Sequence, residues 1–452
     1  MIRTVAEARA ALDGGTTTSR GLVTAALDRI ADPAGEGART FLKVHRERAL
    51  AAADAADALH RAGLAPVSPL AGLPVSIKDL LDVAGEVTTT GSKVLAGNPP
   101  AVRDARVVAR LRRAGAAIVG RTNQSEFAFH GTGLNPHFGT PKNPWDRATG
   151  RIPGGSSSGA AISVTDGMAI AAVGTDTGGS IRLPAALCGI VGFKPTAIRV
   201  PQEGCYPLSS VLDSIGPLAP TVTDCLAMDR VLAGVDPDAP LPQARPAGTL
   251  SLFVPTNLVF DDVERHVARA FDAAIGRLSA AGVRIVTGPL PALERVKELV
   301  ALGGFASVET AHTLARIIAE HGDAVDPFVV MRIRRGEGAT AGTWLRLHEI
   351  RAAYMREVWG AVGHHTAMAF PSSPYVAPTI AELEADIDRR ASINAVMLRN
   401  TMIGNNLDCC GISLPCHVPG EAPVGFMLTA APGRDDDLFA ASLTLEPLVA
   451  GR

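Results

Sequence analysis

The feature that most limits what this chain can fold into is a segment with two glycine-framed serine turns, within residues 150–195. The first turn reads GGSSSG over residues 154–159, and the second reads TDTGGS over residues 175–180. The apolar run at 168–173 between them predicts a buried strand. Glycine permits positive φ and lets several backbone N–H groups point at one bound group. The pattern therefore predicts two polar turns held at the ends of core elements.

The second turn has the features of an oxyanion site. The residues after Ser180 predict a helix whose first turn accommodates Pro184. The start of a helix places positive partial charge behind the N–H groups of the turn, and such groups can stabilise the tetrahedral intermediate of acyl transfer. The candidate oxyanion donors are the N–H groups of Thr177, Gly178, Gly179 and Ser180.

Taken alone, each turn is compatible with more than one role. Glycine and serine are common in ordinary loops, and glycine loops at helix starts also bind phosphate. Neither turn has the G-x-x-x-x-G-K-[ST] spacing of a phosphate loop. The residues GSSSG at 155–159 match the nucleophile-elbow pattern G-x-S-x-G, but residues 151–154 make a poor strand to lead into an elbow.

Three motifs together resemble the amidase signature family: GLPVSIKDLLDVAG at 72–85, GGSSSG at 154–159 and GTDTGGSIRLPAALCGIVGFKPT at 174–196. The resemblance implies that amides are hydrolysed or transferred by a Ser-Ser-Lys triad. By position in the motifs, the nucleophile is Ser180, the bridging serine with a cis peptide bond is Ser156, and the base is Lys78. The resemblance is strong over residues 65–225 and looser over 366–449.

The proposed base needs an unusual environment. A lysine at the end of a strand is usually solvated, but Lys78 follows a short apolar segment that predicts a buried strand. Burial lowers the pKa of a lysine and so allows it to act as a neutral base. His130 and His137 flank a nearby loop and are the rival bases of a Ser-His-Asp triad. The family resemblance assigns the base without a histidine, so we expect these two to shape the loop.

Periodicity and composition favour an α/β fold. The chain is 47% apolar and 19% charged, which suits a large core. A helix followed by a strand over 104–120 is the kind of unit that builds sheets with helices on both faces. With the resemblance, we expect a single large α/β/α domain with a central mixed, twisted β-sheet covered by helices on both faces.

The expected organisation has an N-terminal helical segment, residues 1–65, packed on an amidase domain, residues 66–452. Within that domain we expect a catalytic core at 70–225, a variable region at 240–365, and C-terminal sheet strands and a helix at 366–449. Helices are predicted at 4–31 (broken at Gly14 and Gly15), 46–62, 222–233, 262–281, 291–320, 340–362 and 435–449. Strands are predicted at 250–254, 283–286, 367–371, 411–415 and 424–428.

Composition argues against several classes of function. The formal net charge of −2 gives no reason to expect a nucleic-acid surface. No apolar span of 18 residues occurs, so we expect a cytoplasmic protein without a membrane segment. The six cysteines form no C-x-x-C pair and are expected to be reduced. Cys416 and His417 lack further spaced ligands, so no metal is expected, and the resemblance implies no cofactor.

The sequence thus predicts an amidase that hydrolyses the C–N bond of a small carboxylic amide to acid plus ammonia or amine. An acyl-enzyme forms on Ser180, with Ser156 and Lys78 as a proton relay. Asp176 and Arg182 are expected to form a buried or partly buried ion pair or hydrogen-bond network that braces the turn. Candidate substrate-binding residues are Phe127, Phe129, Gly131, Thr132 and Tyr206.

Two alternatives to a free-standing amidase stay open. One is the glutamine-hydrolysing catalytic subunit of a tRNA-dependent amidotransferase, which uses the same serine–lysine chemistry with partner subunits. The second is a non-catalytic scaffold with the same fold, which is disfavoured because all three triad positions are filled. For the amidase itself, the expected partner is a small-molecule amide, and a homodimer is a family-level expectation.

Overall fold

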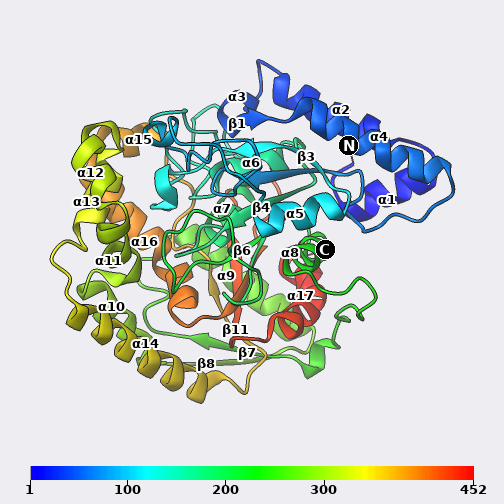
Figure 1. Cartoon of the computed structure of the whole chain (residues 1–452). Helices are drawn as coiled ribbons and strands as arrows, with labels where there is room; N and C mark the ends of the chain where they lie inside the picture. The colour runs from blue at the N-terminus through cyan, green and yellow to red at the C-terminus, as the bar shows by residue number, and fades with distance from the viewer. Residues whose placement is uncertain (1, 452) are drawn as a thin grey trace.

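A mixed β-sheet runs through the structure, a computed structural model that describes residues 2–451 (Figure 1). Within these residues the sheet has 11 strands in the order β1-β3-β2-β4-β6-β5-β10-β11-β9-β7-β8. The strands are β1 (Phe41–Val44), β2 (Pro74–Lys78), β3 (Ala117–Thr122), β4 (Ala171–Thr175), β5 (Val191–Lys194), β6 (Ile215–Ala219), β7 (Ser251–Pro255), β8 (Arg284–Gly288), β9 (Ala367–Pro371), β10 (Cys410–Pro415) and β11 (Gly425–Ala430).

The sheet combines parallel and antiparallel pairs, as expected. Strand β2 is parallel to β3 and β4, whereas β4 is antiparallel to β6. Farther along, β10 is antiparallel to both β5 and β11, and β7 is parallel to β8 and β9. Every residue of β2 and β4 is buried, as is typical of strands covered on both faces.

Helices cover both faces of the sheet. The longer ones are α1 (Val5–Asp13), α2 (Ser19–Ala31), α4 (Arg46–Arg61), α5 (Arg106–Arg113), α6 (Ser158–Thr165), α8 (Val222–Ala233), α9 (Arg265–Ala280), α11 (Gly304–Thr313), α13 (Pro327–Arg334), α14 (Ala341–Val362), α16 (Ile387–Asn406) and α17 (Asp435–Ala450). The shorter ones are α3 (Gly37–Thr40), α7 (Arg182–Cys188), α10 (Val296–Ala301), α12 (Ala315–His321) and α15 (Ile380–Ala385).

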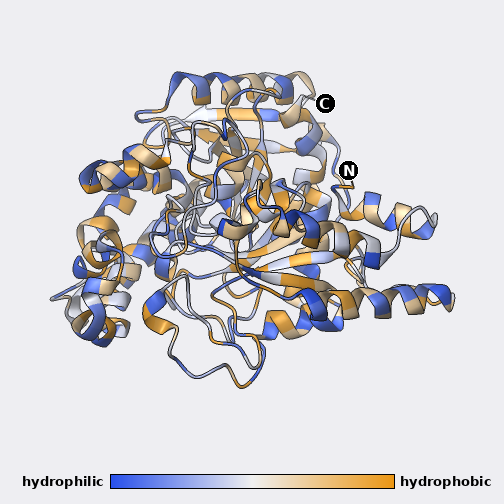
Figure 2. Cartoon of the chain, turned by 90° about the horizontal axis from the view of Figure 1, so that it is seen from above, coloured by the Kyte–Doolittle hydropathy of each residue, from blue (hydrophilic) through white to orange (hydrophobic). Residues whose placement is uncertain are grey.

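Each face of the sheet has its own apolar packing. Val75 and Ile77 of β2 belong to the cluster formed with α1, α5, α8, α9 and α17. Ser76 faces the other way and shares a hydrogen bond of 2.8 Å with Ser163 of α6. Because side chains alternate along a strand, Lys78 shares the face of Ser76. Figure 2 shows the apolar character of the central strands against the mixed outer helices.

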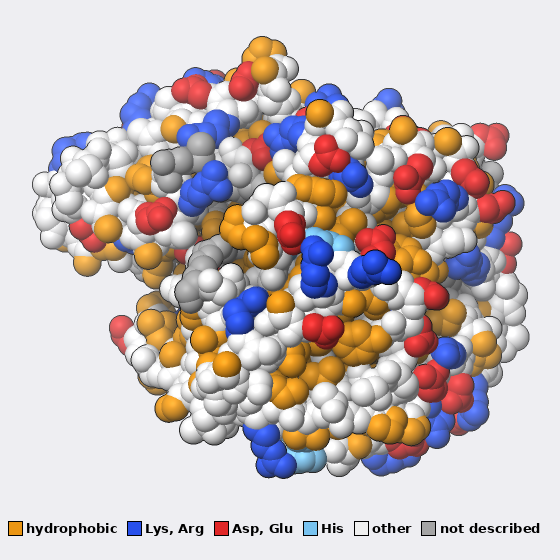
Figure 3. All heavy atoms as spheres, turned by 180° about the vertical axis from the view of Figure 1, so that it is seen from behind, with side chains coloured by type: hydrophobic (Ala, Val, Ile, Leu, Met, Phe, Trp, Pro, Cys, Tyr) orange, Lys and Arg blue, Asp and Glu red, His pale blue; other side chains and the backbone are white. Residues whose placement is uncertain are grey.

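Charged side chains of both signs are interspersed over the face of the molecule shown in Figure 3. This mixture agrees with the formal net charge of −2 and gives that face no single-sign field. Between residues 2 and 451, no helix combines the length and apolar character needed to cross a membrane.

The structure departs from the predicted helices in several places, and two of these departures concern long segments. The segment 291–320 is not continuous. Helix α10 ends at Ala301 and α11 begins at Gly304, and Gly303 and Gly304 at this break have positive φ of 89° and 71°. The long helix α16 was not predicted. Its buried face includes the polar residues Asn394, Asn400 and Thr401, and this obscures the apolar periodicity that marks a packed helix.

The N-terminal segment is more than a set of packed helices. Strand β1 lies within it and pairs with β3, so residues before position 65 supply an edge of the central sheet. Thr18 caps α2 by accepting a hydrogen bond from Gly21 N. The boundary at residue 65 stays a prediction.

Candidate active site

Lys78 is the last residue of β2 and lies at the centre of a small set of hydroxyl groups. Its side chain is buried, and Nζ donates hydrogen bonds to Ser156 Oγ at 2.7 Å and Thr175 Oγ1 at 2.8 Å. Thr175 is the last residue of β4, which is parallel to β2. Parallel neighbours end at the same edge of a sheet, so the two side chains meet although 97 positions separate them in the sequence.

Burial changes the protonation of this lysine. It lowers the pKa of Lys78 to about 7, against the opposing influence of the negative charges of Asp176 and Asp213. Within residues 2–451, no carboxylate lies within ion-pairing distance of Nζ. A substantial neutral fraction therefore exists near pH 7, as a lysine base requires.

Ser156 and Ser180 belong to two turns that are joined through the backbone. The peptide bond between Gly155 and Ser156 is cis, as the sequence resemblance implies. Ser157 N donates to Ser180 O at 3.2 Å. In the described part of the chain, no hydrogen bond joins the Ser156 and Ser180 hydroxyl groups. The structure thus brings Lys78 to Ser156 and holds the backbone of Ser180 against the first turn.

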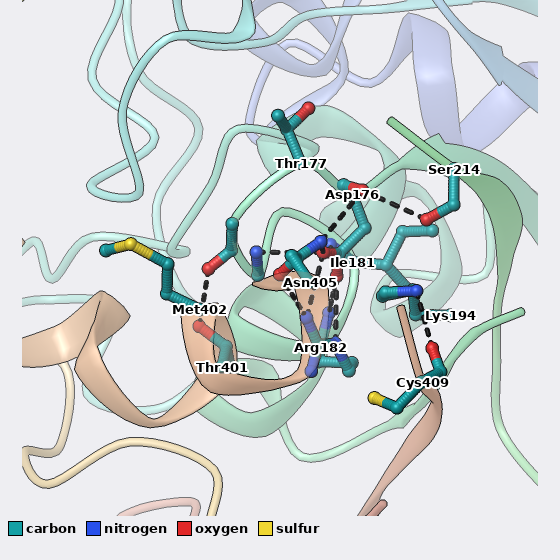
Figure 4. A network of polar contacts seen from close by, with 12 residues as sticks. Asp176, Thr177, Ile181, Arg182, Lys194, Ser214, Thr401, Met402, Asn405 and Cys409 are labelled. Carbon is teal, nitrogen blue, oxygen red and sulfur yellow. Dashed lines mark hydrogen bonds and ion pairs between the residues drawn. The ribbon is translucent and has the colours of Figure 1, made fainter. Parts of the chain in front are cut away.

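The predicted ion pair beneath the second turn is present (Figure 4). Arg182 donates from Nε to Asp176 Oδ2 at 3.1 Å and from Nη2 to Asp176 Oδ1 at 3.0 Å, and both residues are buried. Asn405 of α16 adds a hydrogen bond to Asp176 Oδ1 at 2.9 Å. Burial alone would raise the pKa of Asp176, but the Arg182 guanidinium holds it well below its usual range.

The Asp176 carboxylate also organises the backbone of the turn. Gly179 N, one of the predicted oxyanion donors, donates to Asp176 Oδ1 at 2.8 Å and is therefore already engaged. No hydrogen bond within the described residues uses the N–H groups of Thr177, Gly178 or Ser180. We propose that these three N–H groups hold the oxyanion.

Gly179 has a strict steric reason to be glycine. Its φ is 134°, and a Cβ atom at this position would lie 2.0 Å from Thr401 Oγ1. Thr401, on α16, donates to Gly178 O at 2.7 Å (Figure 4). The helix therefore presses on the turn closely enough to exclude any side chain there.

Three of the predicted substrate-binding residues are aromatic. Phe127 and Phe129 are buried in one apolar cluster, which agrees with a packing role. The ring centroids of Phe127 and Tyr206 are 6.3 Å apart. Tyr206 is partly exposed and, with Thr177, lines a cavity of about 10 Å³. Tyr206 therefore lies beside the proposed oxyanion site, and contact of the three aromatic residues with substrate stays a prediction.

Gly131 and Thr132 lie in the loop that follows. Gly131 N donates to Asn394 Oδ1 at 2.7 Å, and Thr132 Oγ1 shares a hydrogen bond of 2.9 Å with His130 Nδ1. Both residues are buried. The Gly131 bond holds the loop against α16, and the Thr132 bond lies within the loop.

The rival bases lie elsewhere. His130 Nε2 accepts a hydrogen bond from Arg390 at 3.0 Å, and His137 Nε2 lies 2.9 Å from Glu126 Oε1. Neither histidine contacts Ser156 or Ser180 within the part of the chain that the structure describes. Burial keeps the pKa of His130 well below its usual value. Both histidines therefore shape the loop and its surroundings, as expected.

The nucleophile-elbow alternative also lacks its structural context. No strand leads into the first turn, since residues 151–154 contribute only an isolated bridge between Arg151 and Thr379. Ser157, the serine that the elbow pattern selects, donates from Oγ to Thr175 O at 3.3 Å and is buried. It is a structural residue between the two turns.

Sequence reasoning missed several residues that support the site. Thr175 was part of the second turn, but only the pairing of β2 with β4 places it against Lys78. Asp213 accepts a hydrogen bond from Thr177 Oγ1, and burial raises its pKa to about 6. Thr401 and Asn405 lie on the unpredicted helix α16. The sequence contained one signal for these residues: Thr175 and Lys78 both stand at the end of a strand segment.

Comparison with known proteins agrees with this geometry. A family model described as Amidase matches residues 21–439. A 2-amino-5-chloromuconic acid deaminase from Comamonas testosteroni is 37% identical, over 89% of this chain and 87% of the relative. A glutamyl-tRNA(Gln) amidotransferase subunit from Roseiflexus sp. (strain RS-1) is 36% identical, over 94% of this chain and 92% of the relative.

A solved structure described as that of an amidase gives the same result in three dimensions. It matches with a TM-score of 0.86 and 32% sequence identity, covering 98% of this chain and 99% of that chain. The matches extend over nearly the whole sequence and the whole sheet. The chain therefore belongs to the amidase signature family, whose enzymes hydrolyse C–N bonds.

Proposed function

We propose that this protein hydrolyses the C–N bond of a small linear carboxylic amide through an acyl-enzyme on Ser180. The observation that supports this most directly is the buried Lys78 amine, which is bonded to Ser156 Oγ and has its pKa lowered to about 7. A buried lysine without a carboxylate partner is costly, and such perturbed groups concentrate at functional sites.

Acylation begins with the neutral amine of Lys78. Lys78 takes a proton from Ser156 Oγ while Ser156 takes one from Ser180 Oγ, and Ser180 Oγ forms a bond to the amide carbon. This step needs the Ser180 hydroxyl to point at Ser156, a contact that catalytic sites without substrate often lack. The tetrahedral oxyanion is held by the N–H groups of Thr177, Gly178 and Ser180, and each such donor is typically worth about 2.7 to 4 kcal/mol.

Collapse of the intermediate breaks the C–N bond. The proton held by Lys78 returns through Ser156 to the leaving nitrogen, so ammonia or an amine departs and an ester to Ser180 remains. Water then attacks this ester with the same relay as base, which releases the acid and restores the serine. Asp176 and Arg182 hold the turn rigid and contact no reacting atom in this scheme.

The test is release of ammonia or amine by purified wild type and by Ser180→Ala. The substrates are aliphatic, aryl and ureido amides together with glutamine. We expect turnover of at least one class by wild type and its loss in Ser180→Ala, with an acyl adduct of wild type visible by mass spectrometry. Equal release by both proteins, or an adduct on another residue, would exclude the proposal.

The second candidate is the glutamine-hydrolysing subunit of a tRNA-dependent amidotransferase. Its support is the glutamyl-tRNA(Gln) amidotransferase relative, which is 36% identical over 94% of this chain. The deaminase of 2-amino-5-chloromuconic acid, at 37% identity, supports a small-molecule enzyme instead. Weak glutaminase activity as the sole activity, increased by partner subunits, would favour the amidotransferase.

A further inference from the structure

A cavity of about 530 Å³ lies between the helices α1 and α4, at the far end of β2 from the candidate active site. Its wall includes Ala71, shortly before β2, and Gly115 and Ala116, directly before β3. Since β2 and β3 are parallel, these residues mark the amino ends of both strands, whereas Lys78 is at the carboxyl end of β2. Figure 1 shows α1 and α4 at the outer margin of the molecule. The cavity is therefore separate from the catalytic groups, and its volume is typical of a pocket for a small molecule.

Much of the cavity wall is apolar and open to solvent. Leu59, Leu64 and Val67 line it, and they are 41%, 56% and 56% exposed. Helix α4 adds a row of small side chains, namely Ala51, Ala52, Ala55 and Ala56. Single exposed apolar residues are normal on a protein surface, but three large ones on one concave wall indicate a binding site. A ligand with an apolar body would remove this wall from water.

Arg9 of α1 brings a positive charge to the same wall. Its Nη2 donates a hydrogen bond to Ala71 O, and its Nε is buried without a partner. Among the described residues, Nη1 makes no hydrogen bond and no carboxylate forms an ion pair with this guanidinium. Burial lowers the pKa of Arg9, against the opposing influence of the negative charge of Asp13. An arginine stays protonated at neutral pH, so a partly buried cation without an ion-pair partner borders the cavity.

The other arginines of the wall already have acidic partners. Arg48 Nη1 lies 3.1 Å from Glu86 Oε1, and Arg112 Nη1 lies 3.3 Å from Asp104 Oδ2. Asp57, one of the two aspartates that line the cavity, accepts hydrogen bonds from two backbone N–H groups at 2.7 and 3.0 Å. The wall thus carries three arginines against two aspartates, and this balance favours an anionic ligand over a cationic one.

We propose that this cavity binds a monocarboxylic acid with an apolar body, with the carboxylate on Arg9 and the apolar part along α4, Leu64 and Val67. A carboxylate accepts charge-assisted hydrogen bonds from a guanidinium and supplies the missing negative charge. A neutral ligand would leave Arg9 without an ion-pair partner, and a small hydrophilic anion would leave the apolar wall in water. This inference goes beyond the proposed amide hydrolysis and does not depend on it.

The test is isothermal titration calorimetry with 1-naphthylacetate and its neutral analogue 2-(1-naphthyl)ethanol. We expect wild type to bind the acid about 10 to 100-fold more tightly than the alcohol, as is typical of a hydrogen bond to a charged group. Arg9→Gln should lose this preference. Ala55→Phe fills the cavity, so it should weaken both compounds by at least about tenfold while Arg9 is retained. The matched control is Arg46→Gln, an exposed position of α4 outside the cavity wall, which keeps the wild-type affinities.

Three outcomes would overturn the inference. Equal affinity for the two compounds would assign the cavity to a neutral ligand, and absence of acid binding to wild type would leave it to another kind of partner. Unchanged acid binding in Ala55→Phe would place the acid elsewhere on the protein, and this variant decides the matter even where Arg9→Gln fails to fold. Failure of the proposed hydrolysis would leave these results unaffected, because Ser180→Ala is expected to bind the acid in this cavity as wild type does.

Discussion

Lys78 Nζ and Thr175 Oγ1 lie 2.8 Å apart at the neighbouring ends of the parallel strands β2 and β4. Together with the bond from Nζ to Ser156 Oγ, this contact gives a buried amine two hydroxyl partners and no carboxylate partner within the described residues. Hydroxyl groups do not favour the ammonium form as strongly as a carboxylate would. The sheet therefore holds the lysine where its proton is easily lost.

The first prediction is a rise of kcat/KM with pH through the pKa of Lys78. Burial lowers that pKa to about 7, so the neutral base is the minor form below pH 7 and the major form above it. We expect an ascending limb with an apparent pKa near 7, measured between pH 5.5 and 9. Lys78→Ala should lose about 10² to 10⁴-fold in activity near neutral pH and lack this limb. Constant kcat/KM across this range would contradict the role of Lys78.

A second prediction concerns stability. The pKa of Lys78 is about 7 in the folded protein and close to 10.5 in a free side chain, so the unfolded chain binds one more proton between these values. This group therefore makes the free energy of unfolding fall as pH decreases from about 10.5 to 7, with no further change below. Lys78→Met lacks this contribution. Its Tm minus that of wild type should increase from pH 10 to pH 7, and a constant difference would contradict the burial.

A third prediction separates the two hydroxyl partners of Lys78. Ser156→Ala removes the relay, so acylation should fall by about 10² to 10⁴-fold. Thr175→Val removes only an orienting hydrogen bond and should cost about tenfold. Thr175→Ser is the matched control, because it keeps the hydroxyl. Single-turnover rates would measure both effects, and a mild effect of Ser156→Ala would remove Ser156 from the relay.

The fourth prediction concerns the buried pair of Asp176 and Arg182. Arg182→Met leaves the Asp176 carboxylate buried with its charge uncompensated, which should reduce the free energy of unfolding by about 3 to 5 kcal/mol. The surface pair of Arg106 and Glu203 provides the control, since Arg106→Met should cost at most about 1 kcal/mol. Urea denaturation would measure both. Similar losses in the two variants would show that the buried pair is not a special support of the turn.

Much of the fold could be predicted from local sequence. Helix α8 and strand β9 occupy the predicted residues, and most other elements lie within a few residues of their predicted ranges, because their apolar periodicity or glycine ends are local signals. Helix α16 was not predicted because its buried face is polar where it packs on the nucleophile turn. Apolar periodicity indicates a buried helix face only where that face consists of hydrophobic residues. It therefore does not indicate a helix that buries asparagine and threonine side chains.

The sequence by itself determined the two glycine-framed turns, their order, and the residue types that an acyl-transfer site needs at Lys78, Ser156 and Ser180. Glycine conformations and motif spacing are properties of short segments, so they can be read without a structure. Only the tertiary structure decided that Thr175 joins Lys78, that Gly179 N–H is bound by Asp176, and that Arg9 borders an apolar cavity without an ion-pair partner among the described residues. These facts depend on burial and on which strand ends and helices meet, and such long-range packing is not encoded at any one position of the chain.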